Sequence, residues 1–396
     1  MISASVGRRG EPRPRIGLAL GAGGVLGAAW ATGALAVLQQ RVPVPVGDFD
    51  VIVGTSAGSV LAAALRCGLS VDEIVTYQRE GPSGPLAALG SPDLGYGALP
   101  PWPRLVMGSP RLLLSALRSP HRVHPWVIAS ACLPEGRGEH AALRGMVRDM
   151  ALLGDERRAL GARSRGRQGA RHLGSTPADP ANPANSADPA NPADQENPGW
   201  FAGLAGALAA RRNARSPGDA VGSLATDWAQ DGRTWIVAVD YDLGHRVVFG
   251  RDDAPLASLP DAVAASCSVP GWFRPTVIEE RRYVDGGVRS TASADLLAGL
   301  GLDEVYVLAP MASQVTAPPH TALERAERLI RRRMTAATER EIDVLRSEGV
   351  QVTLVTPGPD DLHAMGANLM DPSRRQIVFE TSLRTSAEAF GAGRAA

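Results

Sequence analysis

The hydrophobic pattern at the start of the chain alternates between short apolar runs and stretches of small residues. Residues 15–20 (RIGLAL) and 50–53 (DVIV) predict two short buried strands. Each run is followed by a glycine turn and an alanine-rich stretch of helical character, at 28–39 and at 60–65. Because strand, turn and helix recur in this order, we expect an α/β fold with a mostly parallel central sheet flanked by helices.

The same pattern continues in the second half of the chain. Strands are predicted at 234–239, 246–249, 304–309 and 352–355, and helices at 259–265, 321–347 and 375–390. Residues 81–122 carry apolar clusters punctuated by Pro and Gly, which is typical of a helical cap over a cleft. We expect one α/β domain at 15–310, a flexible tail at 1–14, and a helical and strand extension at 311–396 that packs on the domain.

One segment, residues 155–199, departs from this pattern. It begins with an arginine-rich run and then repeats Ala-Asp-Pro and Ala-Asn-Pro units, with no large apolar residue from 177 to 199. Such a tract buries too little apolar surface to offset its ordering entropy, so we predict a disordered insertion within the domain. A rigid extended spacer is the alternative interpretation.

The charge balance gives no sign of a nucleic-acid partner. The 396 residues carry 41 bases and 41 acids, so no global field attracts a polyanion. Every strong base is an arginine, which excludes Walker-type phosphate loops and Schiff-base cofactors, because both need a lysine. The three cysteines have neither metal-ligand nor disulfide spacing, and we interpret them as small buried apolar residues in a reducing compartment.

The uncharged stretch 16–40 follows a basic N-terminus and could be mistaken for a signal peptide or a membrane span. It contains six glycines, and alanine is the most frequent of its apolar residues. That composition favours a strand, a glycine turn and a helix over either alternative. We therefore expect a cytoplasmic protein.

A serine framed by glycines follows the second predicted strand. In Gly54-Thr55-Ser56-Ala57-Gly58, the glycines allow a sharp turn from strand to helix that lifts the serine side chain out of the sheet. A serine hydroxyl becomes an effective nucleophile when a base removes its proton and donors stabilise the developing oxyanion. The alternative is an ordinary helix start with Thr55 or Ser56 as the N-cap residue.

A glycine-rich loop opens the first predicted helix. Its glycines are Gly21, Gly23, Gly24 and Gly27. A dinucleotide fingerprint would need its third glycine where Leu26 stands, and the second strand ends at the serine turn instead of an acidic ribose ligand. The loop is better suited to present the backbone N–H groups of Gly23 and Gly24 to an oxyanion. Close packing of the helix on the strand would also require small residues.

The third motif is Tyr283-Val284-Asp285-Gly286-Gly287. A carboxylate on a glycine-flanked turn can approach a serine hydroxyl and accept its proton if desolvation raises the carboxyl pKa, which makes Asp285 the candidate base. Asp-Gly between apolar residues is also a common hairpin signal, and this alternative stays open. The seven histidines lack a catalytic context; His320 or His363 would formally fit an α/β-hydrolase triad, but we interpret all seven as structural or exposed.

Taken together, GAGGVLG, GTSAGS and the downstream DGG resemble the motif set of the patatin-like phospholipases. The segments ASCSVPGWFRP and VDYDLGHRVVF are similar to further parts of that family, and the resemblance covers about residues 15–310 apart from the insertion. It implies a three-layer α/β/α fold and a lipid acyl hydrolase without a metal or an organic cofactor. Ser56 would be the nucleophile, Asp285 the base, and the amides of Gly23 and Gly24 the oxyanion hole.

The resemblance also implies a lipid or phospholipid substrate, and with it peripheral contact with a membrane. One position departs from the family pattern, because Leu26 stands where members commonly have Arg or Lys. This departure bears on head-group preference more than on the reaction. The alternative function is a non-catalytic lipid- or protein-binding module on the same fold. A nucleotide-binding oxidoreductase is disfavoured by the glycine spacing.

Two further features have more than one interpretation. Trp102, Trp126 and the leucines 112–114 could line an acyl cleft or dock on a membrane surface, and ordinary core packing is an equal alternative. Asp240 and Asp242 form an isolated pair that could bind a metal, but a hairpin turn is the better interpretation.

Overall fold

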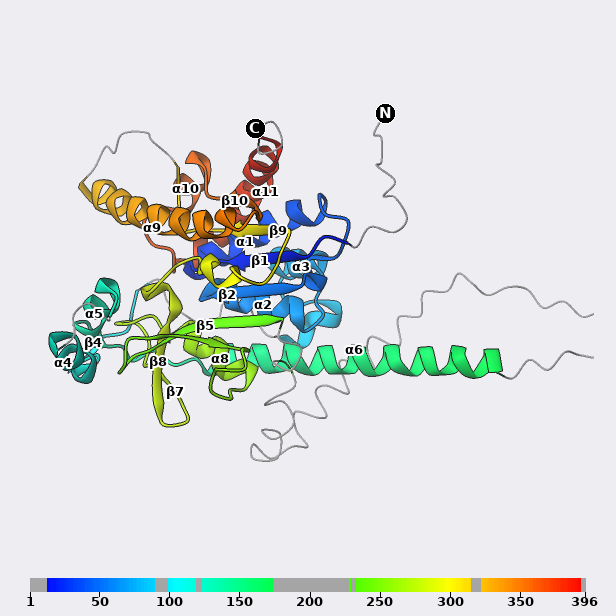
Figure 1. Cartoon of the computed structure of the whole chain (residues 1–396), viewed down its shortest axis with the longest axis horizontal. Coiled ribbons are helices and arrows are strands. Elements are labelled where there is room, and N and C mark those ends of the chain that lie inside the picture. Colours follow the sequence, from blue (N-terminus) through cyan, green and yellow to red (C-terminus); the bar gives the residue numbers. More distant parts are fainter. Residues whose placement is uncertain are drawn as a thin grey trace, which may run out of the picture.

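The computed structural model describes residues 13–89, 99–118, 123–173, 228, 233–314 and 322–392. Its centre is a sheet with the strand order β10-β9-β1-β2-β5-β8-β7, with β6 paired to β5 (Figure 1). Five strands are parallel: β1 (Ile16–Leu20), β2 (Val51–Thr55), β5 (Thr234–Asp240), β9 (Glu304–Leu308) and β10 (Gln351–Val355). Three antiparallel strands complete the sheet: β6 (Arg246–Phe249), β7 (Thr276–Ile278) and β8 (Arg281–Asp285). The prediction of an α/β fold with a mostly parallel sheet is confirmed.

Helices cover both faces of the sheet, because the strands are apolar on both sides. In β1, Leu18 and Leu20 belong to one core, whereas Ala19 belongs to the core on the opposite face. The first core includes α1 (Gly24–Gln39), α2 (Ala57–Arg66), α3 (Val71–Glu80), α6 (Ala141–Leu173), α8 (Leu259–Ser266), α10 (Pro359–Met365) and α11 (Arg375–Ala392). The second includes α9 (Ala322–Ser347) and the short helix η5 (Ala294–Leu297). Further short helices are η1 (Val46–Asp48), η2 (Gly84–Leu89), η4 (Gly286–Val288) and η6 (Pro372–Arg374).

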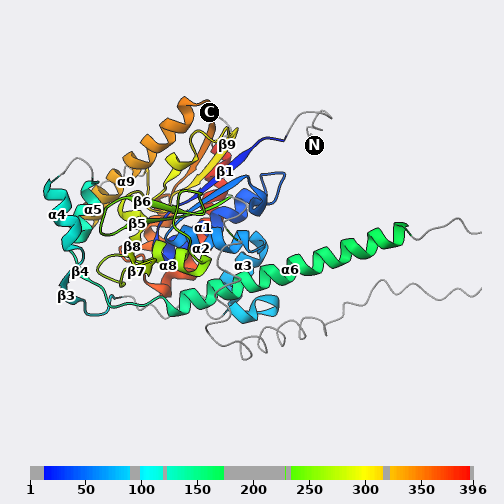
Figure 2. The same ribbon diagram turned by 60° about the horizontal axis from the view of Figure 1, so that its bottom comes forward.

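A small subdomain, which we call the cap (residues 99–118 and 123–135), lies beyond the carboxyl end of β5. It consists of β3 (Arg104–Met107), α4 (Pro110–Arg118), α5 (Pro125–Ala131) and β4 (Pro134–Glu135), with β3 and β4 paired antiparallel. Leu112 and Val127 of the cap pack against Val239 of β5 and Val284 of β8. Figures 1 and 2 both place these elements at the end of the molecule opposite to the one where α6 projects.

The predicted insertion is contradicted by the structure in its first part. Residues 155–173 are the second half of α6, so the prediction of disorder is wrong for them, and residues 174–199 lie outside the described part of the chain. Leu153 is buried, and Arg157 forms an ion pair with Glu73 and donates a hydrogen bond to the carbonyl of Gly68. Composition alone misleads here, because a charged, solvated helix and a disordered tract are both poor in large apolar residues.

Several element boundaries also differ from the predictions. Both α1 and α2 begin earlier than the apolar pattern indicated: α1 begins at Gly24, within the glycine-rich motif, and α2 begins directly after Ser56. The extension 311–396 adds β10 to the central sheet and packs α11 along α1, while the predicted tail lies outside the described residues except for 13–14. The hairpin turn lies at Glu279 and Glu280, which both have positive φ and join β7 to β8, so the hairpin interpretation of Asp285-Gly286 is wrong.

Two further predictions concern the burial of the cysteines and the absence of a membrane-spanning helix. Cys67 is buried and Cys267 is partly buried, but Cys132 is exposed, so the expectation of three buried apolar residues is wrong for Cys132. In the part of the chain that the structure describes, no helix is both long and apolar enough to cross a membrane.

Candidate active site

Ser56 occupies a strained turn between β2 and α2. Its backbone has φ 53° and ψ −121°, a conformation that residues with a side chain rarely adopt, and Ser56 is the residue that precedes the first turn of α2. The Ser56 N–H donates to the hydroxyl of Ser266 (2.8 Å), and that hydroxyl donates to the carbonyl of Val237 (2.6 Å). The side chain of Ser56 makes no hydrogen bond to the helix, so it is not an N-cap in the ordinary sense.

The glycines around Ser56 are required because the turn packs directly on the sheet. A Cβ atom on Gly58 would lie 2.0 Å from the carbonyl oxygen of Leu20, and one on Gly54 would lie 2.6 Å from the carbonyl oxygen of Gly58. The first turn of α2 therefore contacts the end of β1. The backbone N–H groups of this turn lie near Ser56, at the carboxyl end of the parallel strands. The G-x-S-x-G spacing reflects this close approach.

Asp285 ends β8, on the far side of β5 from the strand that carries Ser56. The register pairs Thr55 of β2 with Val237 of β5, and the neighbouring Ala238 of β5 with Asp285. Ser56 and Asp285 therefore both lie at the carboxyl end of the parallel strands. The Asp285 carboxylate is buried and accepts a hydrogen bond from the Gly287 N–H (2.7 Å), and the Ser56 hydroxyl lies close enough to it to lower its pKa.

The environment of Asp285 changes its acidity. Burial raises the pKa of Asp285 from 3.8 to about 6, although the hydrogen bonds from Ser56 and Gly287 oppose the rise. A carboxylate with this pKa is ionised at neutral pH and is a stronger base than an ordinary aspartate. Gly286 allows the strand to pass close to β5, because a Cβ there would lie 2.5 Å from the carbonyl oxygen of Val237.

The glycine loop lies between β1 and α1, at the same edge of the sheet. Gly21 donates its N–H to the carbonyl of Leu308 (2.9 Å), and Gly27 donates to the carbonyl of Gly23 (2.8 Å). Gly24 has φ +60°, and a Cβ on it would lie 2.8 Å from the sulfur of Met370. Among the described residues, the N–H groups of Gly23 and Gly24 have no backbone or side-chain acceptor. They can therefore bind an oxygen of a ligand.

Leu26 does not face the candidate site. Its side chain is fully buried in the core, and its N–H donates to the carbonyl of Leu369 (3.0 Å). A charged side chain at this position would be buried in apolar surroundings, which is unfavourable. The loop is held by packing against the segment 369–370 instead.

An apolar cavity of about 150 Å³ opens beside Ser56 and Gly24. Its apolar lining comes from α1, α2, α3 and α6, from the loops after α2 and α8, and from the segment before α11; it includes Val25, Ala28, Val60, Leu61, Leu69, Ile74, Leu143, Met146, Met150, Phe273 and Met370. Polar side chains on the wall include Gln78 and Arg375, which are hydrogen-bonded to each other (3.4 Å). The cavity can hold an apolar group next to the serine hydroxyl.

Other candidate residues lie elsewhere. Trp102 and Trp126 are exposed in the cap and Leu112 is buried in it, and none of them lines this cavity, so the acyl-cleft interpretation is wrong for them. Asp240 accepts hydrogen bonds from the backbone of the turn between β5 and β6, and Asp242 pairs with Arg282, which confirms the turn interpretation. No cluster in the described part of the chain has the side chains of a metal site.

Among the described residues, no histidine acts on Asp285, and His121 and His320 lie outside the described part of the chain. His140 lines the cavity, where burial lowers its pKa to about 3, so it is neutral. His124 lies at the start of α5 in the cap. The described groups that lower the pKa of Asp285 are the Ser56 hydroxyl and the Gly287 N–H, and neither is a histidine.

Sequence reasoning missed two residues of the site. Ser266 fixes the backbone of Ser56, and Met370 covers the glycine loop and lines the cavity. Ser266 belongs to a small-residue helix that ends in a common serine, and Met370 comes from a loop near the C-terminus. Neither has a local signal, because both contacts form between segments far apart in the sequence.

A serine at a strand-to-helix turn, a glycine loop and a buried aspartate thus lie together at the carboxyl end of an α/β sheet. The chain matches the family model described as patatin-like phospholipase over residues 18–81 and 230–298. The first segment contains the glycine loop and Ser56, and the second contains Asp285. The resemblance that the motifs indicate is therefore confirmed.

Comparisons with individual proteins give remote likenesses. The crystal structure of the type III effector protein ExoU matches with a TM-score of 0.39 and 16% identity, over 96% of this chain and 53% of that one. VipD from Legionella pneumophila matches with a TM-score of 0.36 and 11% identity, over 96% of this chain and 67% of that one. The chain thus spans about half the length of the ExoU chain. No curated protein matches the chain significantly.

Proposed function

We propose that the protein is a lipid acyl hydrolase that cleaves fatty-acyl ester bonds through a dyad of Ser56 and Asp285. The observation that carries the proposal is the position of Ser56. It lies on a strained turn, next to the buried carboxylate of Asp285 whose pKa its hydroxyl lowers, and it lines an apolar cavity. The similarity to the patatin-like phospholipases supports the same reaction class.

In the first step, the Ser56 hydroxyl attacks the ester carbonyl carbon while its proton passes to Asp285. The carbonyl oxygen becomes an oxyanion, and the N–H groups of Gly23 and Gly24 donate hydrogen bonds to it. The carbon–oxygen bond of the ester then breaks, and the leaving alcohol takes the proton from Asp285. The fatty acyl group remains as an ester on Ser56.

In the second step, water attacks the acyl-enzyme. Asp285 accepts a proton from the water, the glycine amides again stabilise the oxyanion, and the Ser56 oxygen leaves with the proton held by Asp285. The products are a fatty acid and the free enzyme. A pKa of about 6 suits a carboxyl that must take up and return a proton in each step.

The cavity supports an apolar acyl chain as the group next to the scissile ester. Its wall is mainly aliphatic and thioether, with Met146 and Met150 among the residues from α6. An acyl chain buried there gains about 0.8 kcal/mol for each methylene removed from water. A lipid ester therefore fits the site better than a small polar ester.

The test is hydrolysis of a panel of esters: short-chain and longer-chain p-nitrophenyl esters and a phospholipid. We expect turnover by the wild type and a loss of about 10³-fold or more in Ser56→Ala. Ser115→Ala, which changes an exposed serine of α4, is the matched control and should keep full activity. Equal turnover by Ser56→Ala and the wild type would favour the alternative, a non-catalytic lipid- or protein-binding module.

A further inference from the structure

The cap exposes an unusual number of large apolar side chains. Residues 99–133 carry eight of the sixteen exposed large apolar residues in the described part of the chain. They are Leu99, Trp102, Val106, Met107, Leu114, Leu117, Trp126 and Leu133, which we call the cap face. Trp102 is 87% exposed and Leu117 is 82% exposed, so these side chains have little contact with the rest of the protein. Apolar surface concentrated in this way marks an interaction site more often than chance.

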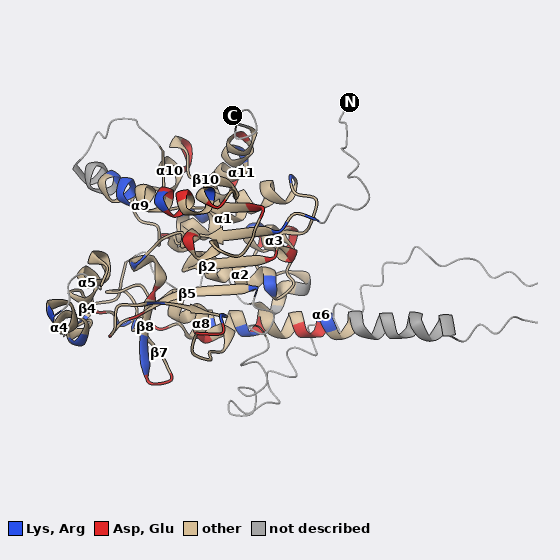
Figure 3. Cartoon of the chain, in the orientation of Figure 1, with Lys and Arg blue, Asp and Glu red and all other residues tan. Residues whose placement is uncertain are grey.

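The charges around the cap face are basic. The sequence from 99 to 133 contains no Asp or Glu, and its bases include Arg111 and Arg118 on α4 (Figure 3). Glu135 of β4 is the first acid after the cap face, and it pairs with Arg104 (3.4 Å). An amphipathic surface with leucine and tryptophan on one side and only arginine as its charge has the composition of an element that lies on an anionic membrane surface.

A basic groove continues from the cap face. It has a volume of about 1000 Å³, and the start of α5, at His124, forms part of its wall. The groove is lined by four arginines, Arg246, Arg251, Arg281 and Arg289, and by two acids, Asp253 and Glu279. Three of the arginines form ion pairs, with Asp295, Asp253 and Asp240, whereas Arg289 forms none with the residues that the structure describes. Because arginines outnumber acids in the lining, an anionic group meets an excess of positive charge there.

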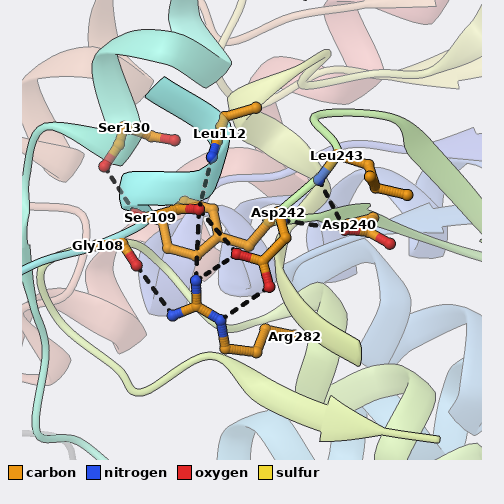
Figure 4. A network of polar contacts seen from close by, with 9 residues as sticks. Gly108, Ser109, Leu112, Ser130, Asp240, Asp242, Leu243 and Arg282 are labelled. Atoms are coloured by element: carbon orange, nitrogen blue, oxygen red, sulfur yellow. Dashed lines mark hydrogen bonds and ion pairs between the residues drawn. The ribbon is translucent and has the colours of Figure 1, made fainter. Parts of the chain in front are cut away.

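The cap is fixed to the strand that carries Asp285. Arg282 lies near the start of β8. Its guanidinium pairs with Asp242 and donates to the carbonyl of Gly108 (3.0 Å) and to the hydroxyl of Ser109 (Figure 4). The Tyr241 hydroxyl donates to the carbonyl of Ser130 (2.8 Å). The cap face is thus presented on a rigid support next to the candidate active site, which lowers the entropic cost of docking.

We propose that the cap face and the basic groove form a docking surface for a bilayer that contains anionic phospholipid. The apolar side chains insert at the level of the head groups, and Arg281 and Arg289 contact lipid phosphates. The site would then meet its substrate in the bilayer, and this part of the proposal rests on the proposed function. The binding itself does not depend on catalysis.

A bilayer fits this surface better than a second copy of the chain or an acidic protein. The apolar side chains come from five short segments and include two tryptophans, which favour the interface between water and lipid. A self-complementary interface would bring the basic groove and the arginines of α4 near the same charges of a second copy. An acidic protein would match the charge, but not the exposure of eight large apolar side chains within the cap.

The first experiment is co-sedimentation of Ser56→Ala, in which lipid would not be consumed, with two kinds of vesicle. One kind is phosphatidylcholine alone, and the other is an equal mixture of phosphatidylcholine and phosphatidylglycerol. We expect binding to the mixed vesicles and at least tenfold weaker binding to the neutral ones, because each arginine at an anionic surface strengthens binding by roughly fivefold. Trp102→Ser with Leu117→Ser should weaken binding by about tenfold or more for each apolar side chain.

Matched controls separate the surface from general effects. Arg281→Gln with Arg289→Gln should weaken binding to the mixed vesicles, whereas Arg346→Gln with Arg384→Gln, which removes two exposed arginines elsewhere, should not. Ile377→Ser, an exposed apolar residue on α11, should also leave binding unchanged. In the active chain, all of these variants should hydrolyse a soluble p-nitrophenyl ester at the wild-type rate, because none touches the site.

Cys132 offers a direct readout, because it lies next to Leu133 and is the exposed cysteine of the chain. An environment-sensitive dye on Cys132 should shift its emission to shorter wavelength with mixed vesicles and lose the shift in Trp102→Ser with Leu117→Ser. The proposal is overturned if neither kind of vesicle binds, if the control variants bind as weakly as the surface variants, or if sedimentation shows a dimer that buries the label. Vesicle binding without ester hydrolysis would instead reject the proposed function alone.

Discussion

Two carboxylates at the carboxyl end of the sheet show how differently one fold can treat the same chemical group. Asp285 is buried without a cation, and its pKa rises to about 6. Asp242 is also partly buried, which by itself would raise its pKa, but the hydrogen bonds and charge of Arg282 and the hydroxyl of Ser109 lower it. The first arrangement leaves a carboxylate that can take a proton, and the second leaves one that holds the cap in place.

The comparison teaches that the partner of a carboxylate decides its task more than its burial does. A guanidinium beside Asp285 would hold the carboxylate ionised and make it a weak base. A serine in place of Arg282 would leave Asp242 without its cation and the cap without this anchor. The predictions below change one of the two sites and compare it with the other, beginning with the largest effect.

The largest effect on activity is expected from neutralising Asp285, with neutralisation of Asp242 as the comparison. Asp285→Asn should lower ester turnover by about 10³-fold or more, because Asn cannot accept the proton of Ser56. Asp242→Asn should leave turnover of a soluble ester within a few-fold of the wild type. The measurement is kcat/KM on a p-nitrophenyl ester, with folding checked by circular dichroism. Equal losses in the two variants would mean that Asp285 acts through the structure and not as a base.

The pH dependence of activity should come next in size. Because the base must be ionised, kcat/KM should fall about tenfold per pH unit below the pKa of about 6 and level off above it. Burial also raises the pKa of Glu341 on α9 to about 6, so Glu341 could produce the same profile. Glu341→Gln is therefore the control. The profile should survive in Glu341→Gln, and a profile that disappears there would assign the titration to Glu341.

Breaking the cap anchor should cost stability more than activity. Asp242→Asn and Arg282→Gln should each lower the free energy of unfolding by about 1–3 kcal/mol, because each leaves the other group without its charged partner. The double variant should lose less than the sum of the two, since it removes both charges. Urea denaturation of the four chains measures this coupling. Strictly additive losses would show that the pair contributes nothing beyond its separate contacts.

The smallest effect concerns the stability cost of the Asp285 charge. As pH rises from 3.8 to about 6, the unfolded chain loses the proton of Asp285 before the folded chain does, so the folded state loses stability across this window. The cost is complete above about pH 6 and absent below the unfolded pKa. Relative to the wild type, Asp285→Asn should therefore gain stability on going from acid to neutral pH. A difference that does not change with pH would contradict the raised pKa.

Much of the sheet and the three motifs could be predicted from the sequence because their signals are local. The apolar runs identify β1, β2, β5, β9 and β10, and the glycines identify turns that need close packing. The position of Ser56 at a turn followed from residues two positions away. Burial of Asp285 did not follow from its own motif, because the apolar surroundings come from other strands and helices.

The parts that could not be predicted depend on contacts between distant segments. Ser266 and Met370 reach the site from α8 and from the loop before α11, and nothing in their own neighbourhood indicates this. The ordered part of α6 was mistaken for disorder because its anchor, the pair of Arg157 with Glu73, joins residues far apart in the chain. The exposure of Trp102 likewise depends on where the cap sits, not on the sequence around it.

The most direct test of the central claim is labelling with a fluorophosphonate probe, followed by mass spectrometry of the modified peptide. The probe reacts with a serine only when a base and an oxyanion site activate it. We expect the label on Ser56 alone, no label in Ser56→Ala, and slow labelling in Asp285→Asn but not in Asp242→Asn. A folded wild type that takes no label, or takes it equally in Asp285→Asn, would contradict the account of Ser56 as a nucleophile activated by Asp285.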